Sequence, residues 1–350
     1  MELIPTDKQP AVARALSTAF GVSTFESIHP LVGGLSPALV FRIVVRGASY
    51  LLRVIVAWPG YAGPARQFRI LTAAAPAGLA PAIRHMSVED GILITDFIAP
   101  QPFPDRMVPH LAPLLRRLHA QPNFPRMQLP TVADTPHAYR DWVNSMVGRL
   151  EAARLLPESL TADLFRRHAE IERLDPRTDA DVVACHNDLK PQNMIFDGTR
   201  LWLVDWEAGF LNDRYADLAM AANFFVRDDA EETAYLDAYF GEPAGDYRRA
   251  RFFLARHVQH LAYAAFLLPI AAKMGAAITP DLDAPDFQDF HRRLVTNEIE
   301  MKTAEERALY AKVHLNAARS NLASPRFAAS LALVSRSEEH TSELQSRGLI

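Results

Sequence analysis

The sequence predicts an α+β protein with two lobes: a small antiparallel β-sheet lobe over residues 1–99 and a larger, mainly helical lobe over residues 100–335. Two observations lead to this division. Short apolar runs separated by turn residues dominate residues 28–97, whereas the later segments repeat apolar residues at helical spacing. Three prolines, Pro100, Pro102 and Pro104, lie where the pattern changes and mark the boundary between the lobes.

The first lobe is expected to contain five strands. Apolar residues at helical spacing predict a leading helix over residues 8–20. Apolar runs between turn signals predict the strands, and a further helix is expected before the last two of them. The strands are 28–32, 39–45, 49–56, 82–88 and 92–97, and the second helix is 65–75.

The second lobe is expected to be built from helices. The stretch 248–274 has apolar residues on several faces, which is typical of a helix at the centre of a helical lobe. The other predicted helices are 107–119, 139–155, 159–172, 287–295 and 304–318.

Polar residues that are typical of catalytic chemistry gather in the stretch 182–219. An apolar strand over 182–185 ends at the polar run 186–193, and a hairpin with Asp197-Gly198 at its turn follows. The returning strand ends at Asp205, so Asp188 and Asn193 in the first loop should lie close to it. Carboxylate and amide oxygens suit Mg²⁺ that holds phosphates, with one Asp left to orient a hydroxyl.

This stretch also resembles a known family. H-N-D-L-K-P-Q-N at 186–193, followed by D-W-E at 205–207, resembles the catalytic and metal loops of kinase-like phosphotransferases. That family includes aminoglycoside phosphotransferases and choline and ethanolamine kinases. The resemblance covers roughly residues 28–335 and implies a protein-kinase-like fold that transfers the γ-phosphoryl group of ATP to a hydroxyl. It implies that Asp188 is catalytic and that Asn193 and Asp205 bind Mg²⁺.

The same resemblance implies a phosphate-binding region in the first lobe. Gly33, Gly34 and Ser36 form a turn whose small residues let the backbone approach a phosphate, although a plain turn explains them equally well. Arg53 occupies the third-strand position where protein kinases place a Lys; the other interpretation is an edge Arg facing solvent. The helix position that should pair with this cation holds Gln67, which cannot neutralise it.

Three further features are interpreted through the resemblance. Residues 96–100 are expected to form the hinge, where Asp96 and Ile98 would meet the adenine through the backbone. Asp217, in the D-L-A element, is expected to brace the catalytic loop. His119 is expected to be a structural histidine packed near that loop.

The residues after Asp205 point to a small acceptor that carries a positive charge. Acidic residues, among them Glu207 and Asp213, alternate with aromatic ones and could hold a cation through carboxylates and ring faces. We therefore expect a hydroxylated amine, with choline or ethanolamine favoured over an aminoglycoside. For residues 228–232 a solvated helix start is the better interpretation, because acids favour first turns.

Two other classes of protein remain as alternatives. A protein kinase would explain Lys190, but D-W-E replaces D-F-G, no A-P-E follows, and Asp205 and Asp217 lie too close in sequence for an activation segment. A non-catalytic nucleotide-binding module would explain Gln67, but Asp188, Asn193 and Asp205 are all present.

Composition narrows the remaining possibilities. A net charge of −4 and a pI near 6.3 give no sign of a nucleic-acid partner. The single cysteine, Cys185, excludes an internal disulfide and a cysteine zinc cluster. We expect no signal peptide, because residues 1–8 lack a basic region followed by an apolar stretch. The longest apolar stretch, 261–272, is too short to span a bilayer, so we expect a cytoplasmic protein. The oligomeric state is left open.

The last residues have a different character. Residues 336–346, R-S-E-E-H-T-S-E-L-Q-S, match the translation of a common sequencing-adapter oligonucleotide. We therefore expect the segment 336–350 to be a non-native tail with no part in the fold.

Overall fold

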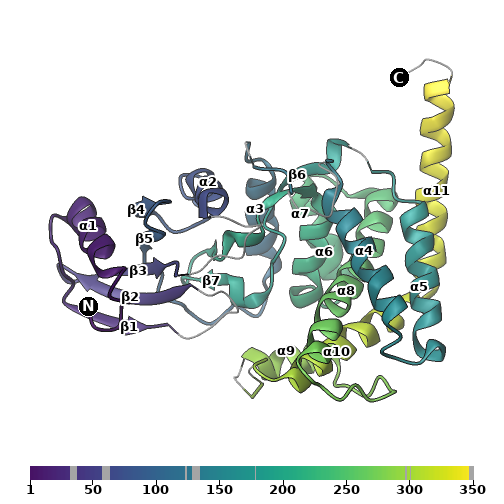
Figure 1. Ribbon diagram of the computed structural model, residues 1–350. Helices are drawn as coiled ribbons and strands as arrows, with labels where there is room; N and C mark the ends of the chain where they lie inside the picture. Colours follow the sequence, from purple (N-terminus) through teal and green to yellow (C-terminus); the bar gives the residue numbers. More distant parts are fainter. Residues whose placement is uncertain are drawn as a thin grey trace. The chain divides into compact units, whose positions relative to one another are not determined.

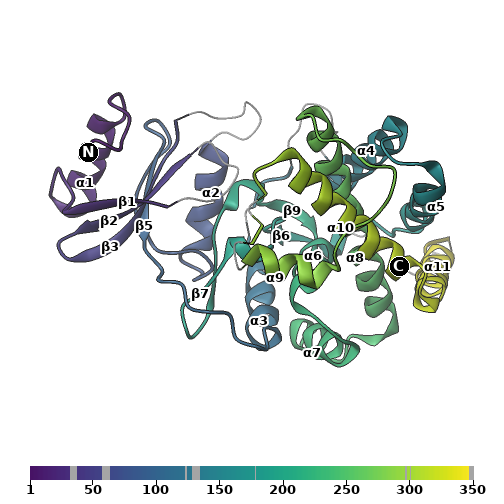
Figure 2. The same cartoon turned by 90° about the horizontal axis from the view of Figure 1, so that it is seen from below.

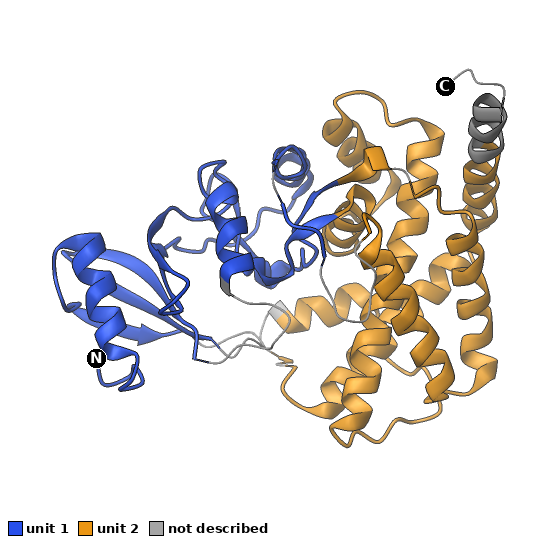
Figure 3. Cartoon of the chain, turned by 45° about the horizontal axis from the view of Figure 1, so that its top comes forward, with its two compact units in different colours: residues 1–131, 183–211 blue, residues 132–182, 212–350 orange. Residues whose placement is uncertain are grey.

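A computed structural model of the chain divides into two compact units (Figure 3). Unit 1 comprises residues 1–131 and 183–211, and unit 2 comprises residues 132–182 and 212–350. The structure describes residues 1–31, 38–56, 64–122, 124–127, 135–177, 179–295, 298–299 and 301–346. The predicted combination of a small antiparallel sheet and a larger helical part is confirmed. The predicted lobe boundary near residue 100 stays a prediction.

Unit 1 contains a five-stranded antiparallel sheet (Figures 1 and 2). Its spatial order is β1-β2-β3-β5-β4, and all five strands lie where the sequence predicts strands, within two residues at most ends. The strands are β1 (Ser27–Pro30), β2 (Leu39–Val45), β3 (Ala48–Val54), β4 (Ile83–Ser87) and β5 (Ile92–Asp96).

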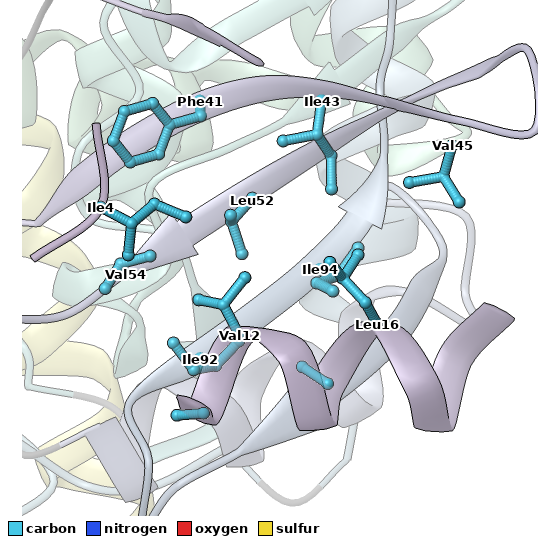
Figure 4. Packing of buried hydrophobic residues seen from close by; sticks show 12 residues of the cluster. Ile4, Val12, Leu16, Phe41, Ile43, Val45, Leu52, Val54, Ile92 and Ile94 are labelled. Atoms are coloured by element: carbon cyan, nitrogen blue, oxygen red, sulfur yellow. The ribbon is translucent and has the colours of Figure 1, made fainter. Parts of the chain in front are cut away.

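Helix α1 (Gln9–Phe20) covers one face of this sheet. Its buried Val12 and Leu16 pack against Ile43 and Leu52, as Figure 4 shows. Side chains alternate between the two faces of a strand, so Arg53, the neighbour of Leu52, lies on the opposite face of β3. The leading helix is therefore an integral part of the sheet's core, and its packing determines which face carries Arg53.

The remaining elements of unit 1 surround the polar stretch. Helix α2 (Pro64–Ala74) packs on the 3₁₀ turn η3 (Trp206–Ala208), and α3 (Val108–His119) packs on β8 (Leu201–Leu203). The predicted hairpin pairs β7 (Met194–Phe196) with β8, and Asp197 accepts hydrogen bonds from two backbone amides at its turn. The other elements are η2 (Pro191–Asn193) and the paired strands β6 (Val182–Cys185) and β9 (Phe210–Asp213), of which residues 183–185 and 210–211 belong to unit 1.

Unit 2 is helical. Helix α8 (Gly245–Lys273) packs against four other helices, which confirms its predicted central position. These are α4 (Ala138–Ala153), α6 (Arg214–Phe225), α10 (Ala304–Leu322) and α11 (Pro325–Ser346). The unit also holds α5 (Glu158–Arg173), α7 (Asp229–Phe240), α9 (Phe287–Val295) and the 3₁₀ turn η1 (Asp179–Asp181).

Two sequence expectations concern helix ends in unit 2. Asp228 caps α7 by accepting a hydrogen bond from the Glu231 amide, which confirms the helix start. The expected solvation is wrong for Glu232, which is 2% exposed and pairs with Arg326. Helix α11 continues through residues 336–346, the first part of the suspected tail, so the foreign origin of the tail stays a prediction. Within the described residues, the structure contains no helix with the length and apolar character needed to cross a membrane.

Candidate active site

The loop after β6 is held in place by two buried polar side chains. His186 is fully buried, its Nε2 donates to the carbonyl oxygen of Val204 at 2.9 Å, and its ring lies 4.7 Å from that of Trp206. Asn187 adopts a left-handed backbone with φ 62° and donates its side-chain amide to the carbonyl of Ala208 at 3.0 Å. These contacts tie the predicted catalytic loop to the segment that contains the predicted metal ligand.

Asp188 follows in the same loop and is held by two neighbouring side chains. Its Oδ2 accepts hydrogen bonds from Lys190 Nζ and Asn193 Nδ2, both at 2.7 Å. The same Asn193 amide also donates to the backbone oxygen of Asp188 at 2.9 Å. The side chain of Asp188 stays 24% exposed, so the carboxylate is oriented by its neighbours and still accessible to a ligand.

Asn193 and Asp205 lie next to each other although a hairpin separates them in sequence. The amide of Val204 donates to the carbonyl oxygen of Asn193 at 3.0 Å, which places Asp205 directly after the contact. Asp205 itself has φ 62°, a left-handed conformation that costs about 1–3 kcal/mol in a non-glycine residue and is concentrated at functional sites. The predicted proximity of the two residues is therefore observed.

Arg53 reaches this segment from β3. Its Nη1 donates to Asp205 Oδ1 at 3.4 Å, and its Nη2 forms a close ion pair with the carboxylate of Glu207. Only 10% of the Arg53 side chain is exposed, so the alternative of an edge residue facing solvent is wrong. These charged groups all belong to unit 1: Arg53, Asp188, Lys190, Asp205 and Glu207.

Gln67 does not take the position that the sequence suggested. It is 3% exposed in α2, and its Oε1 accepts no hydrogen bond from any described residue. A guanidinium only donates, so a hydrogen bond between Arg53 and Gln67 would have to use that oxygen. The partner of Arg53 comes from the metal loop instead of helix α2.

The structure describes only some of the residues that the sequence suggested for nucleotide binding. Gly33, Gly34 and Ser36 lie outside the described residues. Asp96 ends β5 and pairs with Arg84 through two hydrogen bonds of 2.6 and 2.9 Å, so its carboxylate is engaged on the sheet. Half-buried Ile98 follows in the segment that β7 anchors through a 2.7 Å bond from the amide of Gln101. Adenine binding at this segment stays a prediction.

Three further residues that the sequence singled out lie at helix ends or inside a helix: His119, Asp213 and Asp217. His119 lies at the end of α3 with its Nε2 3.9 Å from the thiol of Cys185, next to the catalytic loop as expected. Asp213 caps α6 by accepting from the Tyr215 amide, and it pairs with Arg251 at 2.7 Å. Burial raises the pKa of Asp213, although Arg251 opposes the shift. Asp217 is fully buried in α6, and its bracing role stays a prediction.

Sequence reasoning missed two residues of this site. Lys190 was noted only as a match to protein kinases, although its ammonium group orients Asp188. Arg66 in α2 donates to the backbone oxygen of Glu207 at 3.0 Å and lies over the Phe210 ring. The available signal was the position of Arg66 beside Gln67, but no local pattern indicates which loop a helix side chain will reach.

Comparison with known proteins agrees with this geometry. The model of the phosphotransferase enzyme family matches residues 27–253, which is more than half of the chain. A curated relative, the protein LicA of Haemophilus influenzae, is 51% identical over 35 residues. That match spans 10% of this chain and only 13% of the length of LicA.

Solved structures show the same fold. A choline/ethanolamine kinase family protein from Mesorhizobium loti aligns with a TM-score of 0.64 and 20% identity, covering 94% of this chain and 99% of that one. A spectinomycin phosphotransferase, solved with ADP and spectinomycin, aligns with a TM-score of 0.53 and 14% identity, covering 93% and 97%. The predicted kinase-like fold is confirmed, and the chain belongs to the phosphotransferase enzyme family.

Proposed function

We propose that this phosphotransferase moves the γ-phosphoryl group of ATP to the hydroxyl of a small amine, in the manner of a choline or ethanolamine kinase. The observation that carries the proposal is one cluster in unit 1: Asp188 held by Lys190 and Asn193, beside Asp205 and Arg53. Such a cluster provides a base, metal ligands and a phosphate-binding cation, which are the parts that phosphoryl transfer requires. A cytoplasmic location, where ATP is plentiful, belongs to the same proposal.

Asp188 is the proposed base. Its carboxylate would accept the proton of the acceptor hydroxyl as the oxygen attacks phosphorus. Lys190 and Asn193 hold Oδ2, which fixes the orientation of the carboxylate before the acceptor arrives. Positioning and electrostatic stabilisation supply most of the catalysis in this class of reaction.

Asn193 and Asp205 fit the requirements of a magnesium site. Both offer hard oxygen ligands, and the bond between Val204 and Asn193 brings them to one place in the structure. Bound Mg²⁺ would supply positive charge to the phosphate oxygens. Arg53, on the adjacent face of β3, is placed to balance further phosphate charge through its planar guanidinium.

Two arguments favour an amine acceptor. The segment after Asp205 is acidic and aromatic, which suits a cation better than a neutral polyol. The similarity to a choline/ethanolamine kinase family protein and to LicA points in the same direction. A protein substrate is disfavoured because only η3 and β9 lie between Asp205 and α6, which leaves no space for a peptide-binding activation segment.

An acceptor panel with radiolabelled ATP tests this proposal. Choline, ethanolamine and an aminoglycoside are compared with glycerol and with 3,3-dimethylbutan-1-ol, which has the shape of choline but no charge. We expect transfer to at least one amine, strong preference for choline over its neutral analogue, and transfer reduced by ~10²–10⁴-fold in Asp188→Asn. ATP consumption without any acceptor product would favour a different activity.

Other outcomes identify the alternatives. Aminoglycoside phosphorylation without turnover of choline or ethanolamine would favour the alternative that the protein is an aminoglycoside phosphotransferase. Robust phosphorylation of glycerol with no amine product would contradict the charge argument. Phosphorylation of a peptide array would revive the protein kinase alternative, and absence of any ATP turnover would leave the non-catalytic module.

A further inference from the structure

The acid beside Arg53 comes from an unexpected place in the chain. We propose that Glu207 is a positioning residue, which holds Arg53 in its phosphate-binding orientation and takes over the role of the acid that helix α2 lacks. This inference rests on the proposed function, because it assigns Arg53 to the phosphates of ATP. It also changes the interpretation of Glu207, which the sequence suggested as a ligand of the cationic acceptor.

Helix α2 offers no acid for this purpose. Its sequence, P-A-R-Q-F-R-I-L-T-A-A, contains neither Asp nor Glu, and Gln67 accepts no hydrogen bond within the described structure. The side chain of Arg53 is nevertheless only 10% exposed, and a guanidinium in such surroundings needs a counter-charge. Glu207 provides it through a close ion pair with Nη2.

The backbone at Glu207 is held firmly enough to position a side chain. Arg66 of α2 donates to the carbonyl oxygen of Glu207 at 3.0 Å, and the preceding residue, Trp206, is buried. Helix α2 also packs closely on the end of this turn, because a Cβ on Gly209 would lie 3.0 Å from Ile70. Helix α2 therefore still contributes to the position of Arg53, but it does so by holding the backbone of η3.

Glu207 and Asp205 have different roles towards Arg53. Asp205 accepts from Nη1 at 3.4 Å, whereas the Glu207 contact is much closer. Asp205 is the proposed Mg²⁺ ligand, and a carboxylate bound to a cation attracts a guanidinium less. Glu207 is the acid that keeps Arg53 in place when Mg·ATP is bound. Nη1 then remains directed to the side of Asp205, where the phosphates would lie.

A double-mutant cycle tests this role. Glu207→Gln, Arg53→Met and the double variant are compared by calorimetry for binding of Mg·ATP and adenosine. We expect Glu207→Gln to weaken Mg·ATP binding about tenfold, the loss typical of a hydrogen bond to a charged group. The same substitution should change Mg·ATP affinity less than twofold in the Arg53→Met background. Adenosine, which has no phosphate, should bind equally to all variants.

Two further variants separate positioning from general damage. Glu207→Asp keeps the charge and should restore part of the Mg·ATP affinity. Asp90→Asn, the matched control, removes the partner of Arg14 in an ion pair elsewhere in unit 1 and should leave nucleotide binding unchanged. If Glu207→Gln fails to fold, the cycle is repeated with Glu207→Asp in its place, with Arg53 intact and in the Arg53→Met background.

Several results would overturn the inference. These are unchanged or tighter Mg·ATP binding in Glu207→Gln, an equal effect with and without Arg53, or a selective rise in the acceptor KM, which would make Glu207 an acceptor ligand. Wild-type protein that binds no Mg·ATP would also overturn it. Failure of the acceptor panel alone would not, because the binding cycle uses no acceptor and tests Glu207 separately.

Discussion

Each unit encloses an arginine among carboxylates, but the two arginines are paired differently. In unit 1, the carboxylates of Asp188, Asp205 and Glu207 keep between 24% and 33% of their side chains exposed. In unit 2, Arg251 is 5% exposed and pairs with Asp175, Asp181 and Asp213, while its guanidinium lies 4.5 Å from the Tyr215 ring. The carboxylates around Arg251 keep 12–26% of their side chains exposed, much like those of unit 1, so the difference lies in the pairing of the cations: Arg53 pairs with two carboxylates and Arg251 with three.

This difference separates charged groups that are available for catalysis from charged groups that stabilise the fold. A carboxylate that contacts solvent can exchange water for a metal ion or a hydroxyl at little cost. Arg251 has a different role, because it is enclosed and shared by three carboxylates, and its removal leaves three negative charges close together without a counter-charge. Substitutions in unit 1 should therefore change activity with little effect on stability, and substitutions in the Arg251 network should do the reverse.

The largest expected effect is on turnover in unit 1. Asp188→Asn should reduce kcat by ~10²–10⁴-fold, because a positioned base is lost, while Mg·ATP binding and melting temperature stay close to wild type. Asp205→Ala should weaken Mg·ATP binding instead, as measured by calorimetry. Equal loss of nucleotide affinity in both variants would mean that the two acids do not have separate roles.

The reverse effect is expected at Arg251. Arg251→Met leaves three carboxylates without their shared cation and should lower the free energy of unfolding by about 3–5 kcal/mol, as for other broken buried pairs. Arg248→Met, which removes an exposed pair with Glu242, serves as control and should cost about 0–1 kcal/mol. Urea unfolding measures both. A small effect at Arg251 would remove the distinction between the units.

Acid should weaken unit 2 through its buried histidines. Burial lowers the pKa of His257 to about 3 and that of His291 to about 4. The unfolded chain binds protons near pH 6.5 that the folded unit excludes, so stability is complete above this pH and falls towards pH 4. Each such histidine should cost about 1.4 kcal/mol per pH unit within that window.

Hydrogen exchange at pH 7.5 and 5.5 measures this effect separately in each unit. Amides of α8, which carries His257, should lose protection at the lower pH, while those of β2 and β3 should change less. His257→Leu should reduce the difference between the two pH values. Loss of protection in the sheet before the helices would contradict the predicted order.

A smaller effect is expected from Gln67→Glu. The substitution places a carboxylate at a buried position of α2, and if it comes within reach of Arg53 it competes with Glu207 or supplements it. We expect a change in ATP affinity within about tenfold, or ~1.4 kcal/mol. Calorimetry with Mg·ATP measures it, and Arg53→Met in the same background is the control. An unchanged affinity would mean that the two residues do not meet.

The smallest expected effect concerns the end of the chain. If residues 336–350 are adapter-derived, they have no evolved contacts in unit 2, and their deletion should leave the melting temperature within experimental scatter. Deletion from residue 325 onwards is the contrasting variant, because it removes buried Phe327 and Val334 and should lower the melting temperature. A drop of several degrees in the shorter deletion would show that the tail packs on the fold.

Local patterns were sufficient for much of the fold and for the core of the site. The strand β2 and the helix α9 begin and end where their hydrophobic patterns predict, because burial on one face imposes a period that the sequence must carry. Asn193 contacts Asp188 and is hydrogen-bonded to the residue before Asp205, because a short hairpin connects the two loops, while the catalytic and metal-binding roles of the three residues stay predictions. The spacing of a hairpin is a local property, so the sequence contains it directly.

Contacts between distant segments had to come from the tertiary structure. The sequence determined that a cation lies on β3 and that α2 offers only Gln67 where an acid is expected, but it did not identify Glu207 as the partner of Arg53. Residues 53 and 207 meet because α1 fills one face of the sheet and turns Arg53 to the other, while α2 holds η3 against that face. Neither packing choice leaves a periodic signal near position 207, so only the folded chain decides which acid Arg53 binds.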